Sequence, residues 1–97
     1  MLYLVEMTQD RPMPAGAEDH AALVDRVCRS LELLDADPRV KGGVRAGGRS
    51  LVFVIEAADH EQLDRWLQDI PLWELVDRTE VTPLVSFTAR LRYNTGS

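Results

Sequence analysis

Residues 70–84 read Ile-Pro-Leu-Trp-Glu-Leu-Val-Asp-Arg-Thr-Glu-Val-Thr-Pro-Leu, and this stretch says more about the fold than any other part of the chain. Pro71 ends an apolar helical pattern, because proline lacks the amide hydrogen that a helix interior needs. The chain then turns through Leu72 and Trp73 into an extended pattern over residues 76–84. A helix, a tight corner and a strand are therefore predicted in that order.

The segments that precede and follow this stretch alternate between strand and helix patterns. Strand patterns, with apolar residues at alternate positions, cover residues 2–8, 40–47, 50–56 and 85–93. Helical patterns, with apolar steps of three and four, cover residues 17–36 and 59–70. Gly47 and Gly48 supply a hairpin turn, and Asp59 with Gln62 forms a capping box at the second helix. Cys28 falls in the apolar stripe of the first helix and is predicted in the core.

The order β-α-β-β-α-β is that of a ferredoxin-like fold, so we predict a single α+β domain over residues 1–97 with an antiparallel sheet. Side chains predicted to face the helices are Tyr3, Val5, Met7, Val40, Val44, Leu51, Phe53, Ile55, Thr79 and Val81. Those on the opposite side, called the open face below, are Leu2, Leu4, Glu6, Lys41, Arg45, Val52, Val54, Glu56, Arg78 and Glu80. The open face mixes apolar and charged residues, which favours a lined cavity or a dimer interface; the alternative is a monomer with a solvated face.

The two ends of the chain resemble the muconolactone isomerase family. Members of that family open Met-Leu-Phe-Leu-Val-x-Met, against Met-Leu-Tyr-Leu-Val-Glu-Met here, and carry Leu-Pro-Leu-Phe-Pro-Tyr-Met followed by Glu-Val-Thr-Pro-Leu near the C-terminus. The resemblance covers both ends well and the middle poorly. It implies a dimeric α+β barrel in which the open faces of two subunits meet. It also implies that such dimers can assemble into higher homo-oligomers. A strand at 85–93 would then pair across the dimer.

Composition excludes several classes of partner. A net charge of −5 and a pI near 4.9 argue against nucleic acid, and no apolar run approaches a membrane span. Met1 leads straight into a strand pattern, so we expect no signal peptide and a cytoplasmic location. One cysteine excludes an internal disulfide, no residues stand at metal-ligand spacing, and the glycine pairs lack a dinucleotide fingerprint. We therefore predict neither a metal nor a cofactor.

The candidate catalytic residues are Glu6 and Glu56. We take the first and third strands as parallel neighbours, which places these carboxylates close together on the open face. Paired carboxylates in a partly apolar cavity can divide the roles of acid and base. The alternative is that Glu6 pairs with Arg78 and Glu56 with Arg45, as ion pairs that fix strand register.

The candidate substrate-binding residues are Arg45, Arg78, Lys41 and Trp73. The two arginines could hold a substrate carboxylate by paired hydrogen bonds, and Lys41 shares their face. Trp73 either lines the cavity or packs under the end of the sheet. The two histidines, His20 and His60, stand near helix starts in polar surroundings and are predicted to have surface or capping roles.

The resemblance implies a reaction as well as a fold. Muconolactone isomerases move a proton across an unsaturated lactone without a cofactor, through an enolate-type intermediate. The chain departs from the family pattern at residues 39–45 and 73–75, and its glycine pairs and lost tryptophans would open space for another substrate. We predict a cofactor-independent isomerase or cyclase acting on a small activated carbonyl or lactone compound. The alternatives are a non-catalytic ligand-binding or assembly subunit and a cofactor-free decarboxylase or monooxygenase.

Overall fold

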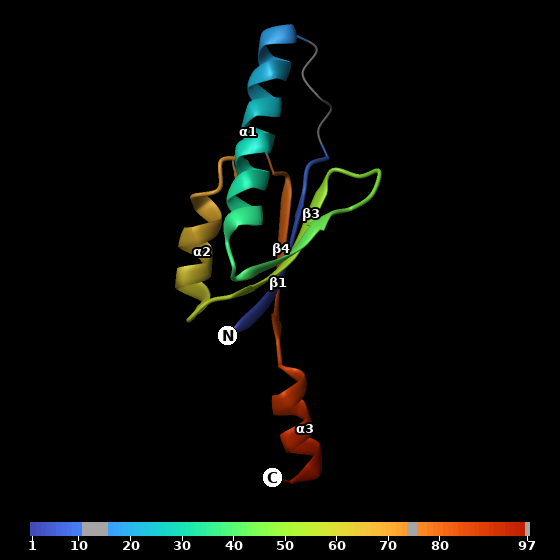
Figure 1. Ribbon diagram of the computed structural model, residues 1–97, viewed down its shortest axis with the longest axis vertical. Helices are drawn as coiled ribbons and strands as arrows, with labels where there is room; N and C mark the ends of the chain where they lie inside the picture. Colours follow the sequence, from blue (N-terminus) through green and yellow to red (C-terminus); the bar gives the residue numbers. More distant parts are fainter. Residues whose placement is uncertain (11–15, 74–75, 97) are drawn as a thin grey trace.

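The computed structural model of the chain describes residues 1–10, 16–73 and 76–96, so Glu74 and Leu75 of the corner lie outside it. The described elements are β1 (Leu2–Thr8), α1 (Ala17–Ala36), β2 (Val40–Val44), β3 (Ser50–Glu56), α2 (His60–Gln68), β4 (Arg78–Leu84) and α3 (Phe87–Thr95) (Figure 1). The predicted bounds of β1, α1 and β3 are confirmed, and β2 stops earlier than predicted, at Val44.

The four strands form an antiparallel sheet in the order β2-β3-β1-β4, which confirms the ferredoxin-like α+β prediction. One part of that prediction is wrong. β1 and β3 are neighbours but run antiparallel, so Leu2 lies opposite Glu56, and Glu6 lies opposite Val52. The reason is topological, because the hairpin after β2 reverses the chain before β3 begins. Pro83 falls on the edge strand β4, where the missing amide hydrogen costs no ladder hydrogen bond.

One face of the sheet forms the core with α1 and α2, which lie on the same side of it (Figure 1). The central strands behave as predicted, with Tyr3 and Val5 fully buried and Phe53 3% exposed. The edge strands do not, since Val44 on β2 is 51% exposed and Val81 on β4 is 42% exposed. Two helices cover the middle of the sheet and leave the inner sides of both edge strands partly open.

Helix α1 packs Val27, Leu31 and Leu34 against the core, but Cys28, which was predicted to lie there too, does not. Cys28 is exposed, and Ser30 is fully buried in its place. Burial of this serine is tolerated because its hydroxyl donates to the Arg26 carbonyl at 2.9 Å and accepts the amide hydrogen of Leu72 at 3.0 Å. The second bond joins α1 to the corner that follows α2.

A second contact fixes the same corner. The Arg26 guanidinium donates from Nε and Nη2 to the Pro71 carbonyl at 3.1 and 2.9 Å. Within the corner, the amide of Trp73 donates to the Ile70 carbonyl at 2.9 Å. The Pro-Leu-Trp stretch is thus held in place by polar groups of α1 as well as by burial of Leu72.

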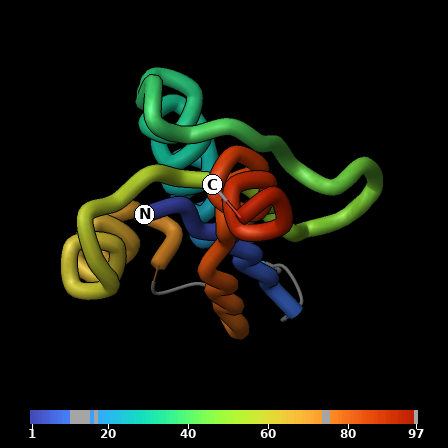
Figure 2. The backbone as a smooth tube through the Cα atoms, turned by 90° about the horizontal axis from the view of Figure 1, so that it is seen from below, coloured from blue at the N-terminus to red at the C-terminus, as the bar shows by residue number. Residues whose placement is uncertain are grey.

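The C-terminal segment is a helix, which corrects the predicted strand over 85–93. Ser86 caps α3 by accepting the Ala89 amide hydrogen at 3.1 Å, and Gly96 ends it in the left-handed region at φ 72°. Figure 1 shows α3 projecting from the end of β4, away from the body of the molecule, and Figure 2 shows the same helix nearly end-on from below. The chain measures 60 × 24 × 20 Å, and its 16.0 Å radius of gyration exceeds the value of about 12.5 Å for a compact chain of this length.

Candidate functional site

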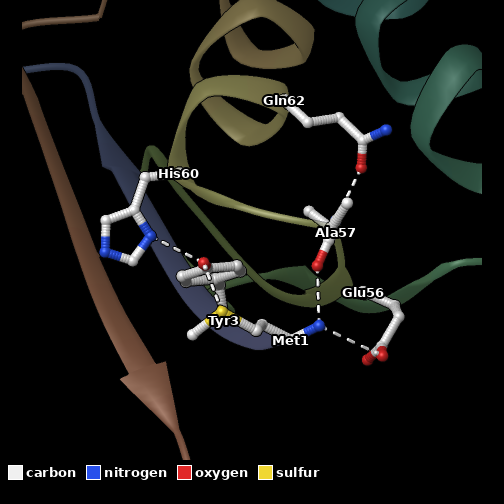
Figure 3. Close-up of polar contacts among 7 residues, drawn as sticks. Met1, Tyr3, Glu56, Ala57, His60 and Gln62 are labelled. Atoms are coloured by element: carbon white, nitrogen blue, oxygen red, sulfur yellow. Dashed lines mark hydrogen bonds and ion pairs between the residues drawn. The ribbon is translucent and has the colours of Figure 1, made fainter.

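The predicted catalytic pair does not form within one chain. Because β1 and β3 are antiparallel, Glu6 and Glu56 lie four register positions apart, about 13 Å along the strands. Glu6 accepts from Arg45 Nη2 at 3.1 Å, whereas Glu56 lies 3.4 Å from the N-terminal ammonium of Met1 (Figure 3). Each carboxylate therefore has its own cationic partner, and the two are not neighbours within one chain.

The other predicted residues are also dispersed. Arg78 donates to Asp10 at 3.0 Å, and Lys41 is exposed on β2. Trp73 is half-buried against the hydrophobic core, which is the packing alternative. The alternative ion pairs, Glu6 with Arg78 and Glu56 with Arg45, are also wrong. The one contact among the predicted site residues is that between Glu6 and Arg45, within the part of the chain that the structure describes.

Cavities lie on the helix side of the sheet, and one of them is bounded by the corner. This corner cavity has a volume of about 340 Å³. Its described lining is Met7, Gln9, Val27, Leu31, Val44, Gly48, Arg49, Ser50, Leu51, Leu72 and Val76. The wall is mainly apolar, and the polar side chains of Gln9, Arg49 and Ser50 come from the ends of β1 and β3. The Gln9 amide donates to the Arg49 carbonyl at 3.1 Å and ties these two ends together.

The second cavity, called the hairpin groove, runs between α1 and β2 and has a volume of about 410 Å³. Its described lining is Leu31, Glu32, Leu34, Asp35, Val40, Gly42, Gly43, Val44, Leu51 and Phe53. Three of these residues also line the corner cavity, so the two hollows adjoin. Gly42 and Gly43 of β2 are part of this lining.

The third cavity, of about 330 Å³, lies between α2 and β4 and includes a polar pair that sequence reasoning missed. The Tyr3 hydroxyl lies 2.6 Å from His60 Nδ1, and both residues line the cavity (Figure 3). Asp59 sets His60 at the first position of α2 by accepting the Gln62 amide hydrogen at 2.8 Å, which confirms the predicted cap. The available signal was Tyr3 itself, because a tyrosine at a buried strand position needs a partner for its hydroxyl.

Comparison with protein families matches the muconolactone delta-isomerase model to residues 1–90. The chain belongs to the muconolactone delta-isomerase family. A crystal structure of muconolactone isomerase is 23% identical, with a TM-score of 0.70 over 89% of this chain and 90% of that one. A comparison with curated protein sequences finds no significant match.

A second solved structure shares the fold of this family member. It is 5-chloro-2-hydroxyhydroquinone dehydrochlorinase from Burkholderia phenoliruptrix AC1100 in complex with 2,5-dihydroxybenzoquinone, 19% identical, with a TM-score of 0.57 over 91% of this chain and 97% of that one. The family and these two structures support a small-molecule catalytic function for the fold.

Within 1–10, 16–73 and 76–96, no group of three or more His, Cys, Asp or Glu side chains is placed to hold a metal ion. No helix in the same ranges is both long and apolar enough to cross a bilayer.

Proposed function

We propose that this family member is a cytoplasmic, cofactor-independent isomerase or cyclase that moves a proton on a small activated carbonyl or lactone compound. Family membership over residues 1–90 supports the reaction class. The observation that supports a location for the reaction site is the corner cavity, an apolar hollow of about 340 Å³ beside the family's Pro-Leu-aromatic corner. Its size is within the range of small-molecule sites.

The polar residues at this cavity fit the electrostatic demands of such a reaction. Removing a proton next to a carbonyl leaves an enolate, whose negative oxygen is stabilised by a cation or hydrogen-bond donors aimed at it. Arg49 supplies a permanent cation, and Ser50 and Gln9 supply neutral donors on the same rim. The apolar wall would hold the carbon skeleton and exclude water, which strengthens these interactions.

A ligand-binding subunit without catalysis is the second candidate. The observation that favours it is that neither a carboxylate nor an imidazole lies among the described residues that line the corner cavity. A general base is needed for proton abstraction, so a site without one would bind an anionic ligand and leave it unchanged.

The test combines binding with turnover in one set of variants. Muconolactone is the substrate for isomerisation. The binding probe is 2,5-dihydroxybenzoquinone, and its binding is measured by the quenching of fluorescence from the two tryptophans. Arg49→Gln is expected to lower kcat/KM by about 10²- to 10³-fold, the usual effect of losing an oxyanion-stabilising group. Arg29→Gln on the exposed side of α1 is the matched control, because Arg29 lies on the surface, where it pairs with Asp25 at 3.1 Å.

Two other results would overturn the proposal. If Glu6→Gln and Arg45→Gln abolish turnover while Arg49→Gln spares it, the reaction takes place on the open face. If the probe binds in an Arg49-dependent way but no substrate is converted, the protein is a binding subunit.

A further inference from the structure

The cavity between α2 and β4 is separate from the site that we propose for the reaction. Its described lining is Tyr3, His60, Leu63, Asp64, Leu67, Val81 and Pro83, and none of these residues lines the corner cavity. At about 330 Å³, it is within the size range of small-molecule sites. The cavity can therefore hold a ligand of its own.

Two apolar walls face each other across this cavity. Leu63 and Leu67 of α2 form one wall, and each is 3% exposed. Val81 and Pro83 of the edge strand β4 form the other. Pro83 lies opposite the buried Tyr3 in the strand register, so both point to the helix side of the sheet. Helix α2 does not cover this wall, since Val81 is 42% exposed.

The contact between Tyr3 and His60 decides which polar group the cavity offers. The 2.6 Å separation of the Tyr3 hydroxyl and His60 Nδ1 is shorter than the roughly 2.9 Å usual for a nitrogen donor, and it suits a bond donated by a hydroxyl. The other neighbour of the hydroxyl, Met1 Sδ at 3.5 Å, is a weak acceptor. The hydroxyl therefore donates to Nδ1, and the neutral imidazole carries its hydrogen on Nε2.

The Nε2 hydrogen of His60 is free for a ligand. Figure 3 shows this nitrogen on the side of the ring that faces away from Tyr3. Among residues 1–10, 16–73 and 76–96, the Tyr3 hydroxyl is the one hydrogen-bond partner of the His60 ring. Because Tyr3 is fully buried, it holds the ring in a fixed orientation and tautomer. The family pattern quoted above has Phe in place of Tyr3, so the hydroxyl that sets this donor is a departure from that pattern.

An acceptor lies beside this donor. Asp64 follows His60 by four residues on α2, so the two side chains are neighbours on one side of the helix. Its Oδ2 accepts from Gln68 Nε2 at 2.8 Å, and no cation pairs with it in the described part of the chain. A carboxylate accepts several hydrogen bonds, so Asp64 can accept another and also repels anions.

We propose that this cavity binds a small neutral molecule with a hydroxyl group on an apolar ring, of which phenol is the simplest case. The hydroxyl oxygen accepts from His60 Nε2, and its hydrogen is donated to Asp64. The ring lies between the leucines of α2 and the apolar side chains of β4, whose contact supplies most of the affinity. A hydroxyl satisfies both polar groups with one atom, whereas an ether leaves Asp64 without a donor and a carboxylate meets it as a like charge.

The experiment titrates phenol into the full-length protein and follows the imidazole signals in ¹H–¹⁵N correlation spectra. We expect the His60 signals to shift in a saturable way and to report an Nε2–H tautomer before phenol is added. Anisole, which lacks the hydroxyl hydrogen, and benzoate, which is an anion, are expected to bind at least about tenfold more weakly than phenol.

His60→Asn separates the donor from the contact with Tyr3. The asparagine oxygen can accept from the Tyr3 hydroxyl, but the side chain is too short to place a donor where Nε2 lies. We expect this variant to raise the dissociation constant of phenol about tenfold, the effect of losing one hydrogen bond, with phenol binding then followed by calorimetry. His20→Asn, at an exposed histidine near the start of α1, is the matched control and should bind phenol as the wild type does.

Four results would overturn the proposal. They are an Nδ1–H tautomer of His60 in the free protein, no saturable binding of phenol, equal affinity for phenol in His60→Asn and wild type, and equal affinity of the wild type for phenol, anisole and benzoate. If Arg49→Gln abolishes phenol binding while His60→Asn spares it, the ligand lies in the corner cavity instead. None of these results alters the role proposed for Arg49, which is measured by turnover.

Discussion

The Tyr3 hydroxyl lies 2.6 Å from Nδ1 of His60, and this contact joins β1 to the first turn of α2. The Tyr3 side chain is fully buried, whereas His60 is exposed and borders the cavity between α2 and β4. The phenol and imidazole rings also meet edge to face, with centroids 5.3 Å apart. A buried strand residue thereby fixes the orientation of an exposed histidine, which is how a fold holds a polar side chain ready at a cavity wall.

Tyr3→Phe removes this hydrogen bond and keeps the ring. We expect it to lower the free energy of unfolding by about 0.5–1.5 kcal/mol, the usual net worth of one such bond. Urea denaturation gives the value, and a double-mutant cycle with His60→Ala isolates the coupling between the two side chains. Tyr93→Phe is the matched control, because Tyr93 is 83% exposed on α3. Equal effects of the two Tyr→Phe changes would show that the Tyr3–His60 bond contributes nothing.

Gly42→Ala tests how closely β2 approaches β3. A Cβ added at Gly42 would collide with the Val52 carbonyl oxygen and with Phe53 Cα, both of them backbone atoms that cannot move aside. We expect a loss of about 1–3 kcal/mol in stability, as for overpacking elsewhere. Gly43→Ala next to it is the control, because a Cβ there meets nothing within 4 Å. Thermal or urea unfolding of both variants compares them, and equal stability would contradict the close approach.

Ser30→Ala tests the link between α1 and the corner. The substitution leaves the buried Leu72 amide hydrogen without an acceptor, which costs about 1–3 kcal/mol. Cys28→Ala on the exposed side of the same helix is expected to change stability by less than about 0.5 kcal/mol. The midpoints of urea denaturation measure the change in stability of both variants. A Ser30→Ala protein as stable as Cys28→Ala would mean that Arg26 alone holds the corner.

The sequence predicted most elements because their apolar spacing is set by burial. The alternation of Tyr3, Val5 and Met7 marks a half-buried strand whatever its neighbours, and all three prove buried. The prediction of a strand over residues 85–93 is wrong because Phe87 and Leu91 fit both a period of two and a helical step of four. No packing against the body decides between these readings, and the helix signals at Ser86 and Gly96 are local.

The candidate site was less predictable than the fold, because it depends on long-range geometry. A parallel arrangement of β1 and β3 would place Glu6 and Glu56 side by side, and the reversed direction of β3 separates them. The Glu6–Arg45 contact depends on the position of a hairpin arginine that no periodicity reports. Ser30 was overlooked since polar residues are usually exposed, and its two hydrogen bonds are visible only once α1 meets the corner.

Acid stability should depend on Asp37, in the turn between α1 and β2. Hydrogen bonds from the Arg39 side chain and backbone hold the pKa of the Asp37 carboxyl below its usual 3.8. The unfolded chain therefore binds this proton more readily, so the stabilisation is fully present above about pH 3.8 and is lost as pH falls through the folded-state pKa. We expect Asp37→Asn to lower stability at neutral pH and to converge with the wild type in acid, as measured by urea unfolding across pH. Asp35→Asn, which removes a carboxylate without such a partner among the described residues, should not converge in this way. A constant gap between Asp37→Asn and wild type across the acid range would contradict the assignment.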